Sequence, residues 1–308
     1  MDRLESMAVL VAVVSAGSLS AASRQLRMPL PTVSRKLSEL ESHVKARLLV
    51  RSTRKLVLTD AGRSYVAACK RILEEVAEAE RSASGEYDAP RGELVLSAPV
   101  VFGRLHVLPV TADFLKSFPQ VDVRLVLTDR PLNLIDDQLD MAIRIGTLPD
   151  SRLVAVRVGQ VRSVVCASPA YMREHGTPQS PEELTSHDCV TFAALADAET
   201  WTFAAGQSVR VHSRLVVNTA EAAIGAALAG VGLTRVLSYQ VADAVQAGTL
   251  AIVLGKFESP PLPLSLIYTR ERMLPAKLRA FIDFATPRLR ARLAGRAWSD
   301  RVARTTPS

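Results

Sequence analysis

The sequence predicts an α/β protein in three parts: an N-terminal winged helix-turn-helix, a long linker helix, and a C-terminal domain of two lobes. Three observations predict this order. Apolar residues recur at helical spacing through residues 3–44, a second helical stripe runs through residues 65–83, and apolar strands alternate with helical stretches from residue 93 onward. With 308 residues, the chain is long enough for two or three domains.

The first two helices are bounded by clear start and stop residues. A helix is expected over residues 3–16, and Gly17 after it is typical of a helix end. Ser18 is expected to cap a second helix that ends near Gln25. The turn of residues 27–30 follows, and Pro31 suits the first turn of a third helix, where a missing N–H is not needed.

The third helix has one apolar face and one polar face. Its apolar stripe is Val33, Leu37, Leu40 and Val44. Its polar face is Thr32, Ser34, Arg35, Lys36 and Ser38. Short hydroxyl side chains and an arginine near a helix N-terminus suit base edges and phosphates in a major groove. The pattern therefore indicates a DNA-reading helix, although an ordinary helical hairpin with a solvated face has the same spacing.

Positive charge is concentrated around this third helix. Residues 24–55 hold nine Lys and Arg against only Glu39 and Glu41, and because the whole chain carries a formal charge of +7, the rest sums to zero. The sequence pI of about 9.6 fits a polyanionic partner, and we take that partner to be double-stranded DNA. A second basic cluster begins at Arg270, and its tail is either a solvated extension or a further nucleic-acid contact.

A two-stranded wing is expected over residues 46–58. Its apolar arms are residues 48–50 and 56–58, and residues 52–55 form the turn. Arg51 and Arg54 near the tip suit a minor groove or a phosphate. A solvated hairpin tip is the alternative.

A long helix is expected from its N-cap Thr59 to about Gly85. Its coiled-coil seam is Tyr65, Cys69, Ile72, Val76, Ala79 and Ala83. Such a helix cannot bury its seam alone, so we expect it to form a dimer that presents two reading helices to an inverted repeat. The alternative is that the seam packs on the chain's own C-terminal domain.

Several segments resemble the LysR-type transcriptional regulators. They are LESMAVLVAVVSAGSLSAASRQLRM, LPTVSRKLSELE, RLLVRSTRKLVLTDAG, RGELVLSAPVVFGRLHVLPV and FPQVDVRL. The resemblance implies a ligand-responsive regulator with a periplasmic-binding-protein-like effector domain and a small-molecule co-inducer between its lobes. It also implies a homotetramer built as a dimer of dimers. Two residues depart from the pattern: Leu30 replaces a polar residue, and Leu49 replaces Phe.

The predicted domains follow from these segments. They are a DNA-binding domain at 1–58, a linker helix at 59–86, a hinge at 87–92, an effector-binding domain at 93–293 and a basic tail at 294–308. Lobe I is expected to comprise residues 93–161 and 264–293, and lobe II residues 162–263.

The predicted elements of the effector domain alternate. Strands are expected at 93–98, 121–127, 139–145, 163–167, near 190, and at 209–217, 231–234 and 264–268. Helices are expected at 102–118, between 128 and 139, at 169–174 and 220–229, from 238, and at 276–293. This succession implies mostly parallel sheets.

Candidate effector-binding residues follow strand ends, where α/β sheets hold ligands. The residues alone point to Ser97, Ala98, Pro99, Val100, Val101, Phe102, Thr128, Asn218 and Thr219. The resemblance adds Ile145, Gly146, Thr191 and Phe192. Apolar residues at 99–101, where relatives have hydroxyls, suggest a less polar ligand. Capping and turn chemistry would also explain Ser97, Thr128 and Asn218.

The sequence lacks the motifs that are typical of enzymes and metalloproteins. The sequence contains no phosphate loop, nucleophile elbow, HExxH motif or metal-ligand spacing, so we expect no enzyme, cofactor or metal. Cys189 is either a redox sensor or a buried core residue. No run of 18 apolar residues and no signal peptide occur, which argues against a membrane protein or an exported solute-binding protein, and we expect a cytoplasmic location.

Overall fold

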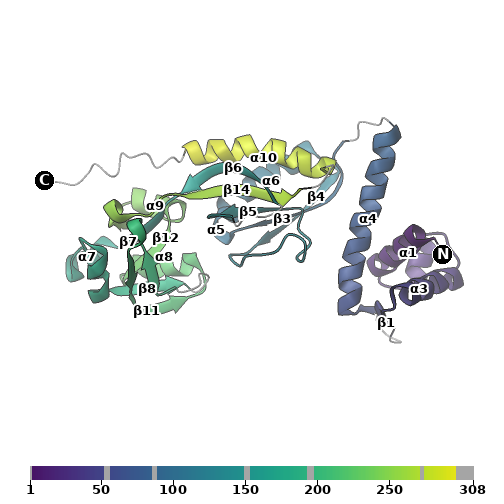
Figure 1. Ribbon diagram of the computed structural model, residues 1–308, viewed down its shortest axis with the longest axis horizontal. Helices are drawn as coiled ribbons and strands as arrows, with labels where there is room; N and C mark the ends of the chain where they lie inside the picture. Colours follow the sequence, from purple (N-terminus) through teal and green to yellow (C-terminus); the bar gives the residue numbers. More distant parts are fainter. Residues whose placement is uncertain are drawn as a thin grey trace. The chain divides into compact units, whose positions relative to one another are not determined.

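The computed structural model describes residues 2–51, 56–84, 89–148, 153–192, 198–270 and 274–295. Contacts divide the chain into two compact units, Met1–Ala89 and Pro90–Ser308 (Figure 1). The predictions for Arg54, for hinge positions 87 and 88 and for tail residues 296–308 lie outside the described residues, as does the side chain of Arg51.

The N-terminal unit contains four helices and a hairpin among its described residues. They are α1 (Arg3–Ala16), α2 (Leu19–Gln25), α3 (Leu30–Val44), β1 (Leu49–Arg51), β2 (Leu56–Leu58) and α4 (Asp60–Ser84). Gly17 ends α1 with φ 71°, a left-handed conformation that glycine adopts without strain. The bounds confirm the expected helices, except that Leu30 belongs to α3 and not to the turn.

One apolar core holds this unit together. Val33, Leu37 and Leu40 of α3 are buried against α1 and α2, as the stripe predicted. The start of α4 joins the same core, because Val66 and Cys69 are buried in it. The predicted coiled-coil seam is therefore wrong at Cys69, which faces the unit's own core and is 0% exposed.

The C-terminal unit contains two five-stranded sheets. The first has the order β4 (Val121–Leu127), β3 (Gly92–Ala98), β5 (Met141–Ile145), β14 (Leu262–Thr269) and β6 (Leu153–Val161). The second has the order β11 (His212–Val217), β8 (Asp188–Phe192), β12 (Leu233–Leu237), β7 (Ser163–Ala167) and β13 (Ala251–Val253). We call the part around the first sheet lobe I and the part around the second lobe II. A short hairpin, β9 (Thr200–Thr202) with β10 (Ser208–Arg210), belongs to lobe II.

Both sheets are mixed, so the expectation of mostly parallel sheets is wrong. In lobe I, β3 is parallel to β4 and β5, but β14 runs antiparallel to β5 and β6. In lobe II, β8 is parallel to β11 and β12, and β7 runs antiparallel to β12 and β13. The antiparallel strands arise because the chain crosses between the lobes and returns. The predicted strand at 209–217 is two strands, which belong to different sheets.

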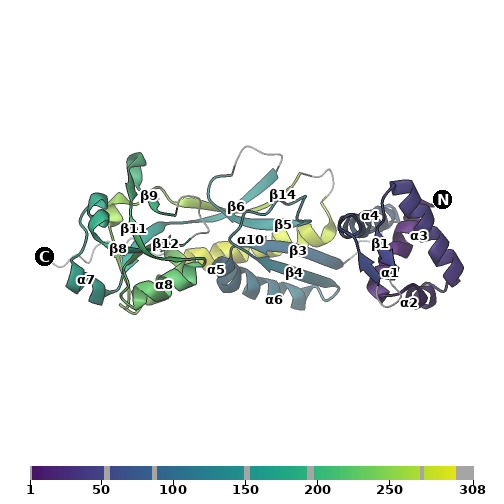
Figure 2. The same cartoon turned by 90° about the horizontal axis from the view of Figure 1, so that it is seen from below.

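Helices cover the sheets. In lobe I, α5 (Val100–Phe102), a π-helical segment (Gly103–Val107), α6 (Leu108–Ser117) and α10 (Ala276–Gly295) lie on one face (Figure 2). The helix expected between 128 and 139 is wrong: a non-helical segment carries buried Leu134 and Leu139 onto the other face.

Lobe II has helices on both faces of its sheet. Its helices are α7 (Pro169–His175), α8 (Ala220–Leu228) and α9 (Ala242–Gln246). Its 3-10 segments are Pro181–Ser186, Ala204–Gly206, Ser238–Gln240 and Gly255–Phe257. Two apolar clusters fill this lobe, one beneath α8 and α9 and the other around Tyr171 of α7 and Trp201 of β9.

No single helix among the described residues is long and apolar enough to cross a membrane. Taken together, α1 and α2 have the length and apolar composition of a membrane span, but the two helices are bent by 116° relative to each other. Apolar residues of both helices are packed in the core of the N-terminal unit.

Candidate functional sites

The turn between α2 and α3 is fixed by short-range hydrogen bonds. Ser18 Oγ accepts the N–H of Ala21 at 3.1 Å and so caps α2, as predicted. Ser23 Oγ donates to the carbonyl of Met28 at 2.6 Å, and Arg27 takes the left-handed conformation with φ 51°. These contacts close the turn and set the direction in which α3 begins.

The N-terminus of α3 has no side-chain cap. The N–H groups of Thr32 and Val33 donate to the carbonyl of Pro29, and the first turn contains no acidic residue. Pro31 lies in this turn without the loss of a hydrogen bond. The partial positive charge of the helix end is therefore not neutralised by the helix's own first turn, which suits a phosphate.

The exposed face of α3 is an open surface made by Arg35, Ser38, Glu39, Ser42 and His43. The side chain of Arg35 is 67% exposed and pairs with Glu39 at 3.3 Å. Sequence reasoning missed Ser42 and His43, although their position one turn beyond Ser38 signals the same face.

Lys36 does not share this face. Its side chain is only 14% exposed and its ammonium pairs with Glu5 of α1. The expectation of an exposed Lys36 is therefore wrong, because the helix turns this residue toward α1. Thr32 and Ser34 are half-buried beside the exposed residues.

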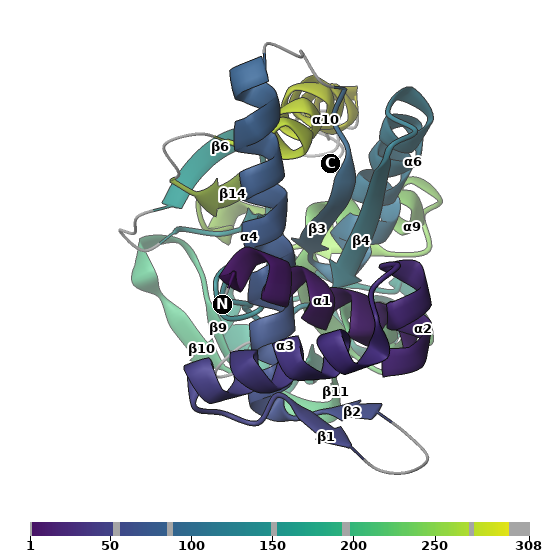
Figure 3. The ribbon, with the colours of Figure 1, turned by 90° about the vertical axis from the view of Figure 1, so that its right-hand side faces the viewer.

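The wing is joined to α3 by a carboxylate that sequence reasoning missed. Glu41 Oε1 accepts the N–H groups of Leu48 and Leu49 at 2.8 and 3.1 Å, and the hairpin lies beside α3 (Figure 3). Thr59 Oγ1 donates to the carbonyl of Arg47 at 2.7 Å and accepts the N–H of Gly62 at 2.9 Å. Thr59 therefore caps α4, as expected, and also anchors the base of the wing.

The lobe I candidates follow adjacent strand ends. Ser97, Ala98, Val101 and Phe102 are buried, whereas Pro99 and Val100 are half-buried. Thr128 joins the end of β3, because its N–H donates to the carbonyl of Ala98 at 3.0 Å.

A carboxylate occupies the start of α5. Asp129 Oδ1 accepts the N–H of Val100 at 3.1 Å, a contact that sequence reasoning missed. The structure thus brings residues 97–102 and 128 together at one edge of lobe I. Ile145 ends β5, which is the neighbour of β3, and Gly146 follows it.

The lobe II candidates follow β8 and β11. Thr191 is buried and shares a hydrogen bond of 2.6 Å with Ser213, so its hydroxyl is already engaged inside the lobe. Phe192 pairs in register with Val217 at the ends of these strands. Asn218 is exposed, and Thr219 Oγ1 caps α8 through the N–H of Ala222 at 3.2 Å. Capping therefore accounts for Thr219, a role that sequence reasoning did not consider for this residue.

Contacts between the lobes involve residues that the sequence did not single out. Arg104 Nη2 in lobe I lies 2.6 Å from Glu221 Oε1 in lobe II. The ring of Tyr239 packs edge-on against Phe102 with centroids 5.5 Å apart. Burial raises the pKa of the Tyr239 phenol, and the negative charge of Asp129 raises it further. The phenol therefore stays neutral at this junction, and its oxygen accepts a hydrogen bond from Gln240 Nε2 at 3.5 Å.

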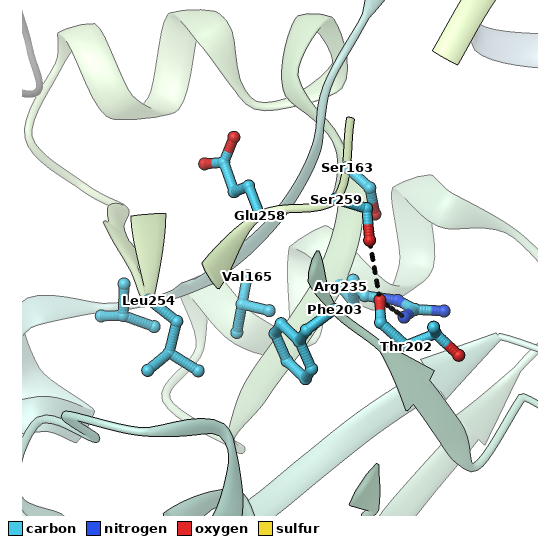
Figure 4. Close-up of a pocket in the computed structure, with 9 residues that line it drawn as sticks. Ser163, Val165, Thr202, Phe203, Arg235, Leu254, Glu258 and Ser259 are labelled. Carbon is cyan, nitrogen blue, oxygen red and sulfur yellow. Dashed lines mark hydrogen bonds between the residues drawn. The ribbon is translucent and has the colours of Figure 1, made fainter. Parts of the chain in front are cut away.

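A small cavity lies inside lobe II near the crossovers (Figure 4). Its polar side includes Ser163, Arg235 and Ser259, and its apolar side includes Val165 and Phe203. Its volume of about 10 Å³ is at the lower limit for a single water molecule. This cavity is too small to hold an effector.

The cysteines are buried. Burial raises the pKa of the Cys166 and Cys189 thiols to about 12, and it also raises the pKa of Cys69. A redox sensor requires an accessible thiolate, so the structure favours the core interpretation of Cys189. Among the described residues, no group of three or more His, Cys, Asp or Glu is arranged to hold a metal ion.

Comparisons with known proteins agree with this architecture. Residues 4–63 match the bacterial regulatory helix-turn-helix protein of the lysR family, and residues 88–290 match the LysR substrate binding domain. The chain therefore belongs to the LysR-type transcriptional regulators: it is a transcriptional regulator with a DNA-binding helix-turn-helix and an effector-binding domain.

Individual relatives match over nearly the whole chain. The HTH-type transcriptional activator AaeR of Escherichia coli (strain K12) is 35% identical, with 93% of this chain and 94% of AaeR covered. The structure of CrgA from Neisseria meningitidis is 33% identical with a TM-score of 0.60 and covers 92% of this chain and 98% of CrgA. The full-length structure of the Vibrio cholerae virulence activator AphB is 27% identical with a TM-score of 0.57 and covers 92% and 98%.

Proposed function

We propose that this protein binds inverted-repeat promoter DNA through α3 and its wing. The observation that carries the proposal is the exposed Arg35 and Ser38 face of α3, which lies beyond an uncapped helix start in the most basic part of the chain. Arg35 and Ser38 read base edges, while Ser18, Pro31, Thr32 and Ser34 position the helix on the backbone. Arg51 and Arg54 of the wing contact the neighbouring groove. Lys36 acts indirectly, because it braces α3 against α1.

We also propose that two copies associate through α4. Ile72, Leu73 and Val76 of this helix are only half-buried and belong to no apolar cluster among the described residues. A helix with such a face gains stability by packing against a second copy. A second interface between effector domains then forms a tetramer, a dimer of dimers, as the family resemblance implies.

A small molecule held between the lobes supplies the signal. The supporting observation is that the strand-end residues of lobe I come together beside the inter-lobe contacts of Arg104 and Tyr239. Apolar side chains at 99–101 favour a weakly polar ligand. The ligand shifts the regulator only if it binds one lobe arrangement more tightly than the other. We ascribe no catalytic step to the protein, and because its partner is promoter DNA we place it in the cytoplasm.

The test is selection of genomic fragments by the purified full-length protein, followed by footprinting in rising salt. We expect a protected inverted repeat and a salt dependence that reflects several phosphate contacts. Repetition with a metabolite extract should change the protected pattern. Equal binding to every DNA fragment, without a selected sequence, would refute sequence-specific regulation by this chain.

A further inference from the structure

The chain crosses between the lobes twice, and each crossover carries one charged residue that faces the other. Arg162 separates β6 of lobe I from β7 of lobe II. Glu258 lies between β13 of lobe II and β14 of lobe I. The two residues are 96 positions apart in the sequence, yet Arg162 Nη1 lies 3.0 Å from Glu258 Oε2. One ion pair therefore joins both connections between the lobes.

Further hydrogen bonds hold each partner in place. The N–H of Ser238 donates to the carbonyl of Arg162 at 2.9 Å, and the N–H of Arg162 donates to Ser238 Oγ at 3.3 Å. Beside Glu258, Ser259 Oγ donates to the carbonyl of Thr202 at 3.2 Å, and Arg235 donates to the same carbonyl (Figure 4). Both crossovers are thus hydrogen-bonded to lobe II.

The ion pair of Arg162 and Glu258 is partly shielded from solvent. The side chain of Glu258 is 12% exposed and that of Arg162 is 35% exposed. Burial raises the pKa of Glu258, and the charge of Arg162 opposes this rise. Removal of one partner from a shielded pair leaves the other charge uncompensated, which costs far more than the loss of a solvated surface pair.

Lobe movement about two crossovers requires backbone rotation within those crossovers. We propose that Arg162 is a positioning residue of the effector response: its ion pair with Glu258 locks the two crossovers to each other and sets the resting arrangement of the lobes. This inference rests on the proposed function, in which a ligand between the lobes changes their arrangement. A bound ligand then changes one defined arrangement of the lobes, because the ion pair prevents free rotation about the crossovers.

The test measures the distance between the lobes by electron paramagnetic resonance in the full-length protein. Spin labels are attached at Lys116→Cys in α6 of lobe I and Arg210→Cys in β10 of lobe II, whose native side chains are 76% and 82% exposed. The three native cysteines are buried and stay unlabelled in the folded protein. Labelled protein is diluted into unlabelled protein, so that only distances within one chain contribute.

We expect a single narrow distance distribution in the parent protein. Glu258→Gln, which keeps the size of the side chain, and Arg162→Met should each broaden or shift it, and Arg162→Lys should restore much of the narrow distribution. The double variant should match the single variants, because the two residues act as one unit. Arg157→Met is the matched control: Arg157 is an exposed arginine on β6 that bonds Gln160 on its own strand, so this change should leave the distribution as it was.

An unchanged distribution in both folded single variants would overturn the proposal, and so would a lower melting temperature without a change in distance. If either Glu258→Gln or Arg162→Met fails to fold, the distance distribution of the other variant tests the proposal. The measurement uses neither DNA nor effector. Failure of the wild-type protein to select DNA would therefore refute the proposed function without bearing on this result.

Discussion

The junction between the wing and α4 makes a sharp stability prediction. A Cβ at Gly62 would lie 2.0 Å from the carbonyl oxygen of Leu48 and 2.9 Å from the carbonyl carbon, so Gly62→Ala forces the backbones apart. The Leu48 carbonyl cannot easily retreat, since it accepts the backbone N–H of Thr59 at 3.1 Å. Overpacking of this kind costs about 1–3 kcal/mol. Because alanine improves helix propensity by about 1 kcal/mol, we expect a net loss of up to about 2 kcal/mol and a displaced wing.

The matched control is Gly225→Ala in α8. No atom lies within 4 Å of a Cβ at that position, so the same change should stabilise the C-terminal unit by up to about 1 kcal/mol. The assay is urea unfolding followed by circular dichroism and by tryptophan fluorescence. Residues 1–89 contain no tryptophan, so fluorescence does not report the unfolding of the N-terminal unit. Gly62→Ala should lower the midpoint of a transition that circular dichroism detects and tryptophan fluorescence does not, and a raised midpoint of that transition would refute the reasoning.

The remaining predictions concern thiols, pH and association. Cys166 and Cys189 should react with a thiol reagent only after denaturation, because burial raises their pKa to about 12; rapid reaction of the native protein would contradict this. Because burial raises the pKa of Glu258 above 4.5, the folded state binds its proton more tightly. The wild type should therefore gain stability over Glu258→Gln as the pH falls from 7 through that raised pKa, as followed by urea unfolding, and a gain on raising the pH would exclude this account. Val76→Asp should weaken self-association in sedimentation at low concentration, and a dimer as tight as the wild type would exclude α4 as the interface.

Periodicity predicted the N-terminal unit well because its helices bury one stripe each. The stripe Val33, Leu37 and Leu40 fixes which face of α3 is inside. It does not fix side-chain partners, so the contact of Lys36 with Glu5, 31 positions away, was not predictable. The same limit applies to Cys69, where helical spacing could not distinguish a seam between copies from the unit's own core.

The effector domain was predicted as strands and helices but not as a topology. Apolar pattern places a strand at 264–268, yet it contains no information on whether β14 runs parallel or antiparallel to β5. The alternation of strands and helices led us to expect a helix between 128 and 139, but Leu134 and Leu139, which are five positions apart, are buried by a non-helical segment. The pair of Arg162 and Glu258 depends on both crossovers meeting, which only the folded chain reveals.

The central claim is that the exposed face of α3 reads DNA sequence, and the most direct measurement compares two variants on the selected operator. Arg35→Ala should weaken specific binding by about 1–3 kcal/mol, roughly 5- to 150-fold, with little effect on unselected DNA. Glu39→Gln removes the same ion pair but keeps the guanidinium, so it should bind at least as well as the wild type. A uniform loss across all sequences would make Arg35 a phosphate contact. Wild-type affinity in Arg35→Ala would contradict the assignment of α3 as the reading helix.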